Sequence, residues 1–503
     1  MATKQKAAKT KAKPAVKTTA KASSKSAGIR VRMYRVGFGD FFLLTLLDTD
    51  DGPQHILIDC GVTPGTTHNG DIGTIKDAVA DMAKETGNHL AMIIVTHRHM
   101  DHIIGFSRCA EVFSKMTVDA VWMPYWESEY DEHASKVQAE MTALAMDVQS
   151  HLALAAGQST EVDAMLGMLR NATGIDENAF TLAAAGNDDD DDGGTKKPGK
   201  GGGSNAKSLS LLKTGLNVTP EYYAKGDTPK LPKALKNAGL VAEILGPPPA
   251  DGLEYLKLTD LKKGVGQYLG ADAASSSSTT FDPFGSRWHV DHTAYPQSAF
   301  REFVTRPKDA PKVIAHAVLE KAVQDAQPAA LLTAVKQLDS FLNNQSLVVL
   351  FAYNGKKLLF VGDAQAGNWE YWMCGGSPTK TPTADDLSDE GKKILGALDF
   401  YKVGHHGSTN ATPITAVEAM GGSFVSMCST QDNTYGTLSK GTEVPRVPLL
   451  EALAKKSPTV RSDDYAVTLK GNEVAAIESS SGKFPGGAKG KFVLGDIYVD
   501  YLL

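Results

Sequence analysis

The densest group of side chains that could do chemistry lies at positions 96–102, where the sequence is THRHMDH. Four of these side chains can bind a metal ion, and they directly follow an apolar run that we expect to be a buried strand. In extended backbone His97 and His99 can face one ion together, while Asp101 and His102 fall on the turn into the next helix. Imidazoles with a carboxylate suit zinc, manganese or iron. A polar loop that is His-rich by chance is the alternative, and it is improbable because the 503 residues include only 13 histidines.

Two further polar groups also follow predicted strands. Asp363 comes after the apolar run 358–361 and a glycine, although a Gly-Asp turn after a strand is by itself common. His405 and His406 come after the run 401–403 and are flanked by glycines that permit tight backbone. Two divalent ions held by such groups would supply a metal-bound hydroxide near neutral pH and would polarise a phosphoryl or carbonyl oxygen. A serine or cysteine nucleophile is then not needed.

The order His-x-His-x-Asp-His, then Asp, then His resembles that of the metallo-β-lactamase fold superfamily. More closely, the chain resembles the hydrolase domain of ComEC-type DNA-uptake proteins and its free-standing relatives. The segments that carry this resemblance span about 29–480 in the family's order, and they are GFGD at 37–40, ILIDCG at 56–61, LGPP at 245–248, NQSLV at 344–348, HHGS at 405–408 and NTYG at 433–436.

This resemblance implies an α/β (α+β layered) fold, an αββα sandwich with a binuclear metal site at one edge between its two sheets. It implies Zn²⁺ as the first choice of ion and Mn²⁺ as the alternative. It also implies these roles: His97 and His99 on the first ion, Asp101 and His102 on the second, Asp363 bridging both, and one of His405 and His406 as a further ligand. We favour His406 as the ligand, with His405 contacting substrate or donating a proton, so that Asp101, His405 and His406 form the catalytic group. Asp59 would orient the ligand loop without binding an ion.

One position of the family pattern stays open in this sequence. Many superfamily members have another His ligand between the first cluster and the bridging Asp, and the candidates here are His133, His151, His289, His292 and His316. The segment WHVDH at 288–292 offers three polar groups, but a polar surface loop also explains it. Without such a ligand, the second ion would be held weakly or completed by water.

Alternating patterns of strand and helix would position these groups. Hydrophobic periodicity and composition predict strands at 29–36, 41–47, 55–59, 89–95, 118–123, 241–245, 347–353, 357–361, 400–403 and 423–428, and helices at 72–84, 103–115 and 132–156. Strands and helices mixed in this order indicate a layered α/β or α+β fold.

We expect one hydrolase domain over 29–503, interrupted by two long insertions. The first, at about 124–206, contains the low-complexity stretch 186–205, which we interpret as a solvated linker. The second, at about 247–340, contains one or two predicted helices within 307–337. Long insertions near a metal site shape substrate access or offer a surface to a protein partner.

The N-terminal tail, residues 1–28, carries eight lysines and no acidic residue. It has almost no large apolar side chain to bury, so we expect it to be disordered. It is either a solubilising tail or an arm that contacts nucleic acid or another polyanion. The rest of the chain holds 44 basic and 58 acidic residues, a formal charge of −14, which would repel a long polyanion unless the site is locally basic.

The composition and the motifs that are missing disfavour several classes of site and function. The four cysteines are scattered, which disfavours a cysteine zinc site or a disulfide framework. Apolar runs are too short for a membrane span, no P-loop or dinucleotide fingerprint is present, and we expect a cytoplasmic protein. The leading hypothesis is a metal-dependent phosphodiesterase or nuclease with a nucleic-acid-like substrate. The alternatives are a hydrolase of lactones, amides or other carboxylic esters, and a non-catalytic scaffold stabilised by metal.

Overall fold

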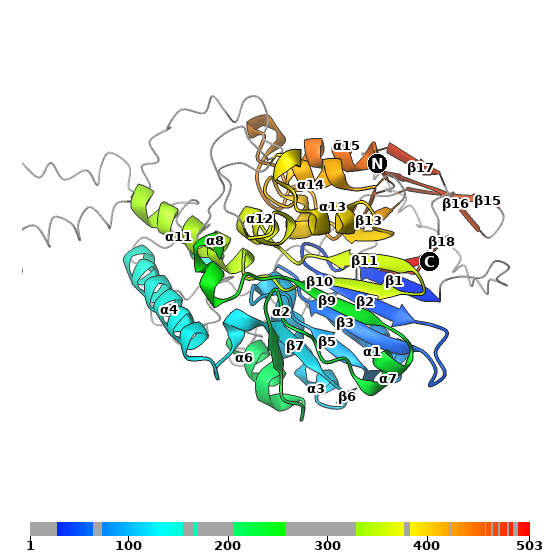
Figure 1. Ribbon diagram of the computed structural model, residues 1–503, viewed down its shortest axis with the longest axis horizontal. Helices are drawn as coiled ribbons and strands as arrows, with labels where there is room; N and C mark the ends of the chain where they lie inside the picture. The colour runs from blue at the N-terminus through cyan, green and yellow to red at the C-terminus, as the bar shows by residue number, and fades with distance from the viewer. Residues whose placement is uncertain are drawn as a thin grey trace, which may run out of the picture.

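The chain is an α/β protein built around two large sheets (Figure 1). The computed structural model describes residues 28–63, 73–153, 165–169, 205–256, 328–376, 383–421, 424–457, 459–463, 466–470, 473–479, 482–485 and 491–503. Most of the lysine-rich tail, nearly all of the linker at 186–205 and the segment 288–292 lie outside these residues.

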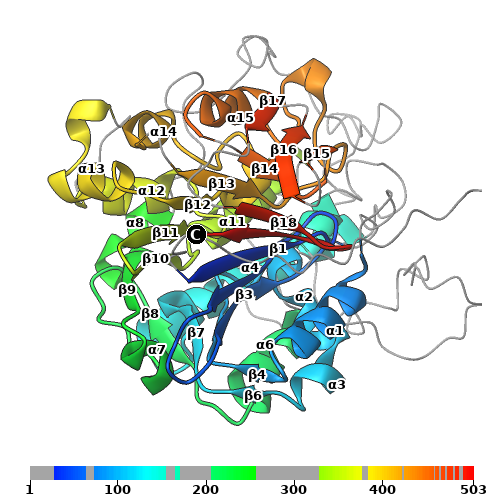
Figure 2. The same cartoon turned by 90° about the vertical axis from the view of Figure 1, so that its right-hand side faces the viewer.

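The eight-stranded sheet has the order β18-β19-β1-β2-β3-β5-β7-β8. The strands from β18 to β3 pair antiparallel, whereas β3, β5, β7 and β8 pair parallel. Strand β1 lies between β2 and β19, so both ends of the described chain share one sheet (Figure 2). The bounds are β1 Ile29–Tyr34, β2 Phe41–Leu46, β3 Gln54–Cys60, β5 Met92–Ile94, β7 Val121–Pro124, β8 Glu221–Tyr223, β18 Lys491–Leu494 and β19 Tyr498–Leu502.

The six-stranded sheet has the order β14-β13-β12-β11-β10-β9. Strands β9, β10 and β11 pair antiparallel, and β11 to β14 pair parallel. The bounds are β9 Val241–Gly246, β10 Val348–Tyr353, β11 Lys356–Phe360, β12 Phe400–Lys402, β13 Val425–Cys428 and β14 Thr459–Arg461. Two smaller sheets are formed by β15 Ala466–Lys470, β16 Glu473–Ser479 and β17 Gly482–Pro485, and by β4 His89–Leu90 and β6 Thr117–Val118.

The two large sheets pack face to face, and helices cover their outer faces. Side chains of both sheets, such as Phe42, Ile58, Phe351 and Phe360, share one buried apolar cluster. A second cluster joins the eight-stranded sheet to helices α1, α2 and α3, and a third joins the six-stranded sheet to α12, α13, α14 and α15 (Figure 2). The helices are α1 Ile75–Glu85, α2 Met100–Arg108, α3 Ala110–Phe113, α12 Ala366–Met373, α13 Asp389–Leu395, α14 Ile414–Ala419 and α15 Val447–Ala454.

A helical group lies beside this layered core (Figure 1). It includes α4 Glu132–Ala153 from the first predicted insertion, and α8 Leu253–Leu256 and α11 Pro328–Asn343 from the second. Their apolar side chains share a fourth buried cluster that includes Trp126, Val137 and Leu338. Two further helices are α6 Asn205–Ser210 and α7 Lys233–Asn237. None of the helices in the described ranges is long and apolar enough to cross a membrane.

The predicted α/β class is confirmed, and most predicted strands form within two residues of the expected bounds. Two strand predictions are wrong, because each predicted strand forms two separate strands. The segment 89–95 forms β4 and β5, and the segment 118–123 forms β6 and β7. Strands β4 and β6 pair with each other, whereas β5 and β7 belong to the eight-stranded sheet. The predicted helix 103–115 begins earlier, at Met100, and is interrupted at Cys109.

Candidate metal centre

The THRHMDH segment connects β5 to α2 and carries its polar side chains into the interior. His99 is the extended N-cap residue of α2, and Asp101 and His102 lie in the first turn. This turn packs directly on β3, because a Cβ atom on Gly61 would lie only 2.2 Å from the backbone of Asp101 and His102. The absence of a side chain at Gly61 therefore lets the start of the helix approach the strand end.

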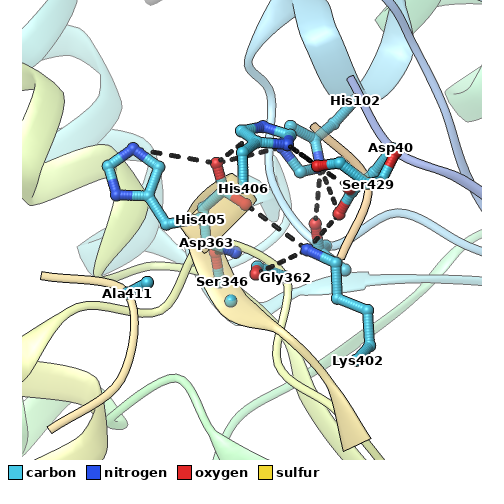
Figure 3. Close-up of polar contacts among 12 residues, drawn as sticks. Asp40, His102, Ser346, Gly362, Asp363, Lys402, His405, His406, Ala411 and Ser429 are labelled. Carbon is cyan, nitrogen blue, oxygen red and sulfur yellow. Dashed lines mark hydrogen bonds and ion pairs between the residues drawn. The ribbon is translucent and has the colours of Figure 1, made fainter. Parts of the chain in front are cut away.

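Four of the predicted ligands come together in one buried cluster. Asp101, His102, Asp363 and His406 each offer a ligand atom, and these atoms all lie within 4.8 Å of one another. His102 Nε2 lies 3.1 Å from Asp363 Oδ2, and His406 Nε2 lies 3.2 Å from Asp101 Oδ2 and 3.4 Å from Asp363 Oδ2. Figure 3 shows His102 and His406 on one side of Asp363, and His405 on the other. These residues come from the α2 turn and from the loops after β11 and β12, so the strand ends of both sheets supply the cluster.

His97 and His99 adjoin this cluster. The His97 ring centroid lies 4.1 Å from that of His102 and 4.6 Å from that of His99. The Nε2 atoms of His97 and His99 are buried and have no hydrogen-bond partner within the described part of the chain, whereas those of His102 and His406 face carboxylate oxygens at 3.1 Å and 3.2 Å. Buried polar atoms are normally satisfied, and imidazole nitrogens that are unpaired or that face carboxylates in one buried site fit a metal ion. The donor set therefore fits the divalent ions that the sequence predicts.

The structure distinguishes His406 from His405. His406 is buried, its Nδ1 lies 2.9 Å from the carbonyl oxygen of Ser429, and its Nε2 faces the carboxylates. His405 has 21% of its side chain exposed, and its Nδ1 lies 2.8 Å from Asn410 Oδ1 and 2.7 Å from Ser408 Oγ. Its Nε2 is 4.0 Å from Asp363 Oδ2. His406 is thus part of the buried cluster, and His405 lies at its solvent side.

Asp59 holds the ligand loop through three hydrogen bonds. Its carboxylate accepts from the Thr96 backbone N–H at 2.8 Å and from the Thr96 hydroxyl at 2.6 Å, and it lies 2.8 Å from His102 Nδ1. Such a contact fixes the ring so that Nε2 points toward Asp363. The position agrees with the orienting role that the sequence predicts.

Two charged residues of this centre, Asp40 and Lys402, are not among the site residues predicted from the sequence. The Lys402 ammonium contacts Asp40, lies 3.6 Å from Asp363 Oδ1 and donates to the Gly362 carbonyl at 2.9 Å (Figure 3). Both side chains are almost fully buried, and Asp40 also lies 3.5 Å from His406 Nδ1. The sequence contains two signals for these residues: Lys402 interrupts a strand segment that is otherwise apolar or aromatic, and Asp40 follows Gly-Phe-Gly.

Burial and neighbouring charges shift the pKa values of this cluster in both directions, and the carboxylates around His102 and His406 raise the pKa values of these two rings. Burial alone would raise the pKa of Asp363, but His102 and His406 hold it well below the usual range. Burial, together with the neighbouring rings of His102 and His99, lowers the pKa of His97 well below 6.5. Asp363 is therefore an anion and His97 a neutral imidazole near neutral pH, which are the protonation states that metal ligands require, whereas His102 and His406 would release a proton when an ion binds.

The additional histidine ligand does not appear in the described part of the chain. His133 is exposed on α4, where its ring lies 5.8 Å from that of Trp126. His151 lies on α4, but its side chain is outside the description, as are His289, His292 and His316 altogether.

No protein-family model matches the chain, and no curated protein matches it either. Buried carboxylates and neutral imidazoles that converge at the ends of strands can hold divalent cations, and one partly exposed histidine can exchange protons beside them.

Proposed function

We propose that this protein is a binuclear metal-dependent hydrolase of the metallo-β-lactamase fold and that it cleaves phosphodiesters. The observation that carries the proposal is the buried cluster of Asp101, His102, Asp363 and His406, with His97 and His99 beside it. Two face-to-face sheets covered by helices agree with the αββα sandwich that the sequence resemblance implies.

We assign the donor atoms to two sets that would share Asp363. Asp101, His102, Asp363 and His406 would hold one ion, and His97, His99 and Asp363 would contribute to the other. Zinc suits this mixture of imidazole and carboxylate, and manganese is the alternative. When bound, the two ions would lower the pKa of a water molecule and polarise the oxygen of the group under attack.

The chain's own residues would position the reaction and move protons. Lys402 offsets part of the negative charge on Asp40 and Asp363, and Asp59 keeps His102 in the orientation that binds. His405 Nδ1 faces the oxygens of Asn410 and Ser408, so Nε2 is the ring nitrogen left to exchange protons; it would give a proton to a leaving oxygen from the protonated ring and become an acceptor afterwards. Its partial exposure makes it accessible from solvent, which supports this role.

Hydrolysis of bis(p-nitrophenyl) phosphate tests this proposal. Protein loaded with Zn²⁺ or Mn²⁺ should release p-nitrophenolate, His97→Ala should abolish turnover, and the matched variant His133→Ala should leave it unchanged because His133 is exposed on α4. A parallel assay with p-nitrophenyl acetate and a lactone covers the carbonyl substrates. Turnover of the esters alone would replace the phosphodiester assignment. Tight binding of metal without turnover of any ester would favour a metal-stabilised scaffold.

A further inference from the structure

The ion beside His97 and His99 has only two predicted ligands of its own, because Asp363 would be shared with the second ion. The second ion has four donors within reach of one another, whereas His97 and His99 belong to no such group among the described residues and lie beside it, with ring centroids 4.6 Å apart. A catalytic zinc ion usually has three protein ligands and an open position for water. Because Asp363 is shared between both ions, a further group near His99 would complete the first.

The carboxylate of Asp339 lies at this position. Asp339 is on α11, and its Oδ1 is 3.8 Å from His99 Nε2. This separation is too long for a hydrogen bond. Two ligands bound at about 2.0–2.2 Å to one zinc ion lie roughly 3.3–3.8 Å apart for bond angles between tetrahedral and trigonal. The spacing therefore fits two ligands of one ion better than a direct bond between them.

The state of His99 is an independent observation. Its side chain is 2% exposed, and its Nε2 has no hydrogen-bond partner among the residues that the structure describes. His97 Nε2 is in the same state, and its ring is next to that of His99. Asp339 Oδ2 accepts a hydrogen bond from the Asn343 side chain at 3.2 Å, which orients the carboxylate and leaves Oδ1 toward His99.

The helical group holds α11 in this place. Val335, Leu338 and Leu342 are buried on one side of the helix and share an apolar cluster with Trp126 and with Val137 of α4. Asp339 follows Leu338 directly, so the packing of this face fixes the position of the carboxylate.

We propose that Asp339, supplied by the second insertion, is a further protein ligand of the ion bound by His97 and His99, in addition to the shared Asp363. This inference rests on the proposed function, because it requires that the cluster binds two ions. A carboxylate here adds negative charge to a pair of neutral imidazoles and so strengthens the binding of a divalent cation. The insertion thereby becomes part of the metal centre, and the affinity of the first ion depends on the packing of α11 against α4.

The test is a titration of the metal-free protein with Zn²⁺ against a chromophoric chelator. The wild type should bind two ions, and Asp339→Asn should bind one of them at least about tenfold more weakly, since even partners that only orient a ligand change affinity about 10- to 100-fold. His99→Ala should weaken the same ion. Glu254→Gln, which removes an exposed carboxylate from α8, should bind both ions as the wild type does.

The outcomes separate the two proposals. Absence of binding by the wild type would overturn the metal centre itself. If Asp339→Asn binds two ions with wild-type affinity, the role of Asp339 is refuted, but the proposed function is not. If this variant does not fold, a crystal structure of the zinc-loaded wild type decides, because an Asp339 oxygen at about 2.0–2.2 Å from the ion supports the proposal and a carboxylate turned away from it refutes it.

Discussion

Replacement of Lys402 by methionine should destabilise the metal-free protein strongly. Lys402→Met removes the positive charge that lies nearest to buried Asp40, as well as the donor to the Gly362 carbonyl; His406 and His102 lie farther away, at 3.5 Å and 3.7 Å. Removing one partner of a buried ion pair costs about 3–5 kcal/mol, because the remaining charge stays in the interior without compensation. This is a large part of the roughly 5–15 kcal/mol that stabilises an ordinary domain.

A lysine on the neighbouring strand provides the matched control. Lys356 Nζ lies 2.9 Å from Asp399 Oδ1, but its side chain is 24% exposed. Pairs that contact solvent contribute about 0–1 kcal/mol, so Lys356→Met should cost at least about 2 kcal/mol less than Lys402→Met. Urea unfolding of both metal-free variants, followed by far-UV circular dichroism, measures this difference. Equal losses of unfolding free energy in the two variants would refute the reasoning.

A second variant tests whether the cost arises from the orphaned carboxylate. Asp40→Asn combined with Lys402→Met removes both charges, so it should be more stable than Lys402→Met alone. Burial raises the pKa of Asp40 even though Lys402 opposes the shift. The deficit of Lys402→Met should therefore shrink as the pH falls and Asp40 takes up a proton. A deficit that is independent of pH would mean that lost packing, not charge, destabilises the variant.

Three more predictions concern the elements around the centre. Asp59→Asn should weaken zinc binding about 10- to 100-fold in a chelator competition, because the carboxylate that orients His102 is lost; unchanged affinity would contradict this. Gly61→Ala should lower phosphodiesterase activity roughly 100-fold, since its Cβ would collide with the start of α2. Gly167→Ala, where the added Cβ meets nothing within 4 Å, should be neutral. Burial, aided by Arg30, lowers the pKa of His55 to about 4, so its contribution to stability is fully present above about pH 6.5 and is lost as the pH falls toward about 4. His55→Gln should flatten the acid side of the stability profile measured by urea unfolding, and an unchanged slope would contradict the assignment.

The centre of the site is predictable because its residues follow strands directly. The ligands of the THRHMDH segment are neighbours in sequence, and Asp363 and His406 each come just after an apolar run. Strands β11 and β12 pair parallel, so the loops that carry Asp363 and His406 lie at the same edge of the six-stranded sheet. Their meeting with the THRHMDH segment depends on the packing of the two sheets.

The remaining parts depend on contacts between distant segments. Asp40 and Lys402 form a pair only after both sheets have packed together, and the bidentate pair of Arg32 with Asp500 requires β19 to lie beside β1. No local pattern specifies such partners. Asp339 lies just beyond 307–337, where one or two helices are predicted, and nothing in the sequence marks it as a ligand. The packing of α11 on α4 brings its carboxylate to His99.

The most direct test of the central claim is an anomalous difference map, recorded at the zinc absorption edge, of crystals of the zinc-loaded protein. The account predicts two peaks about 3.5–4 Å apart, with Asp363 between them, His97 and His99 on one ion and Asp101, His102 and His406 on the other. A map without a peak among these side chains, from protein shown to be folded and exposed to excess zinc, would contradict it.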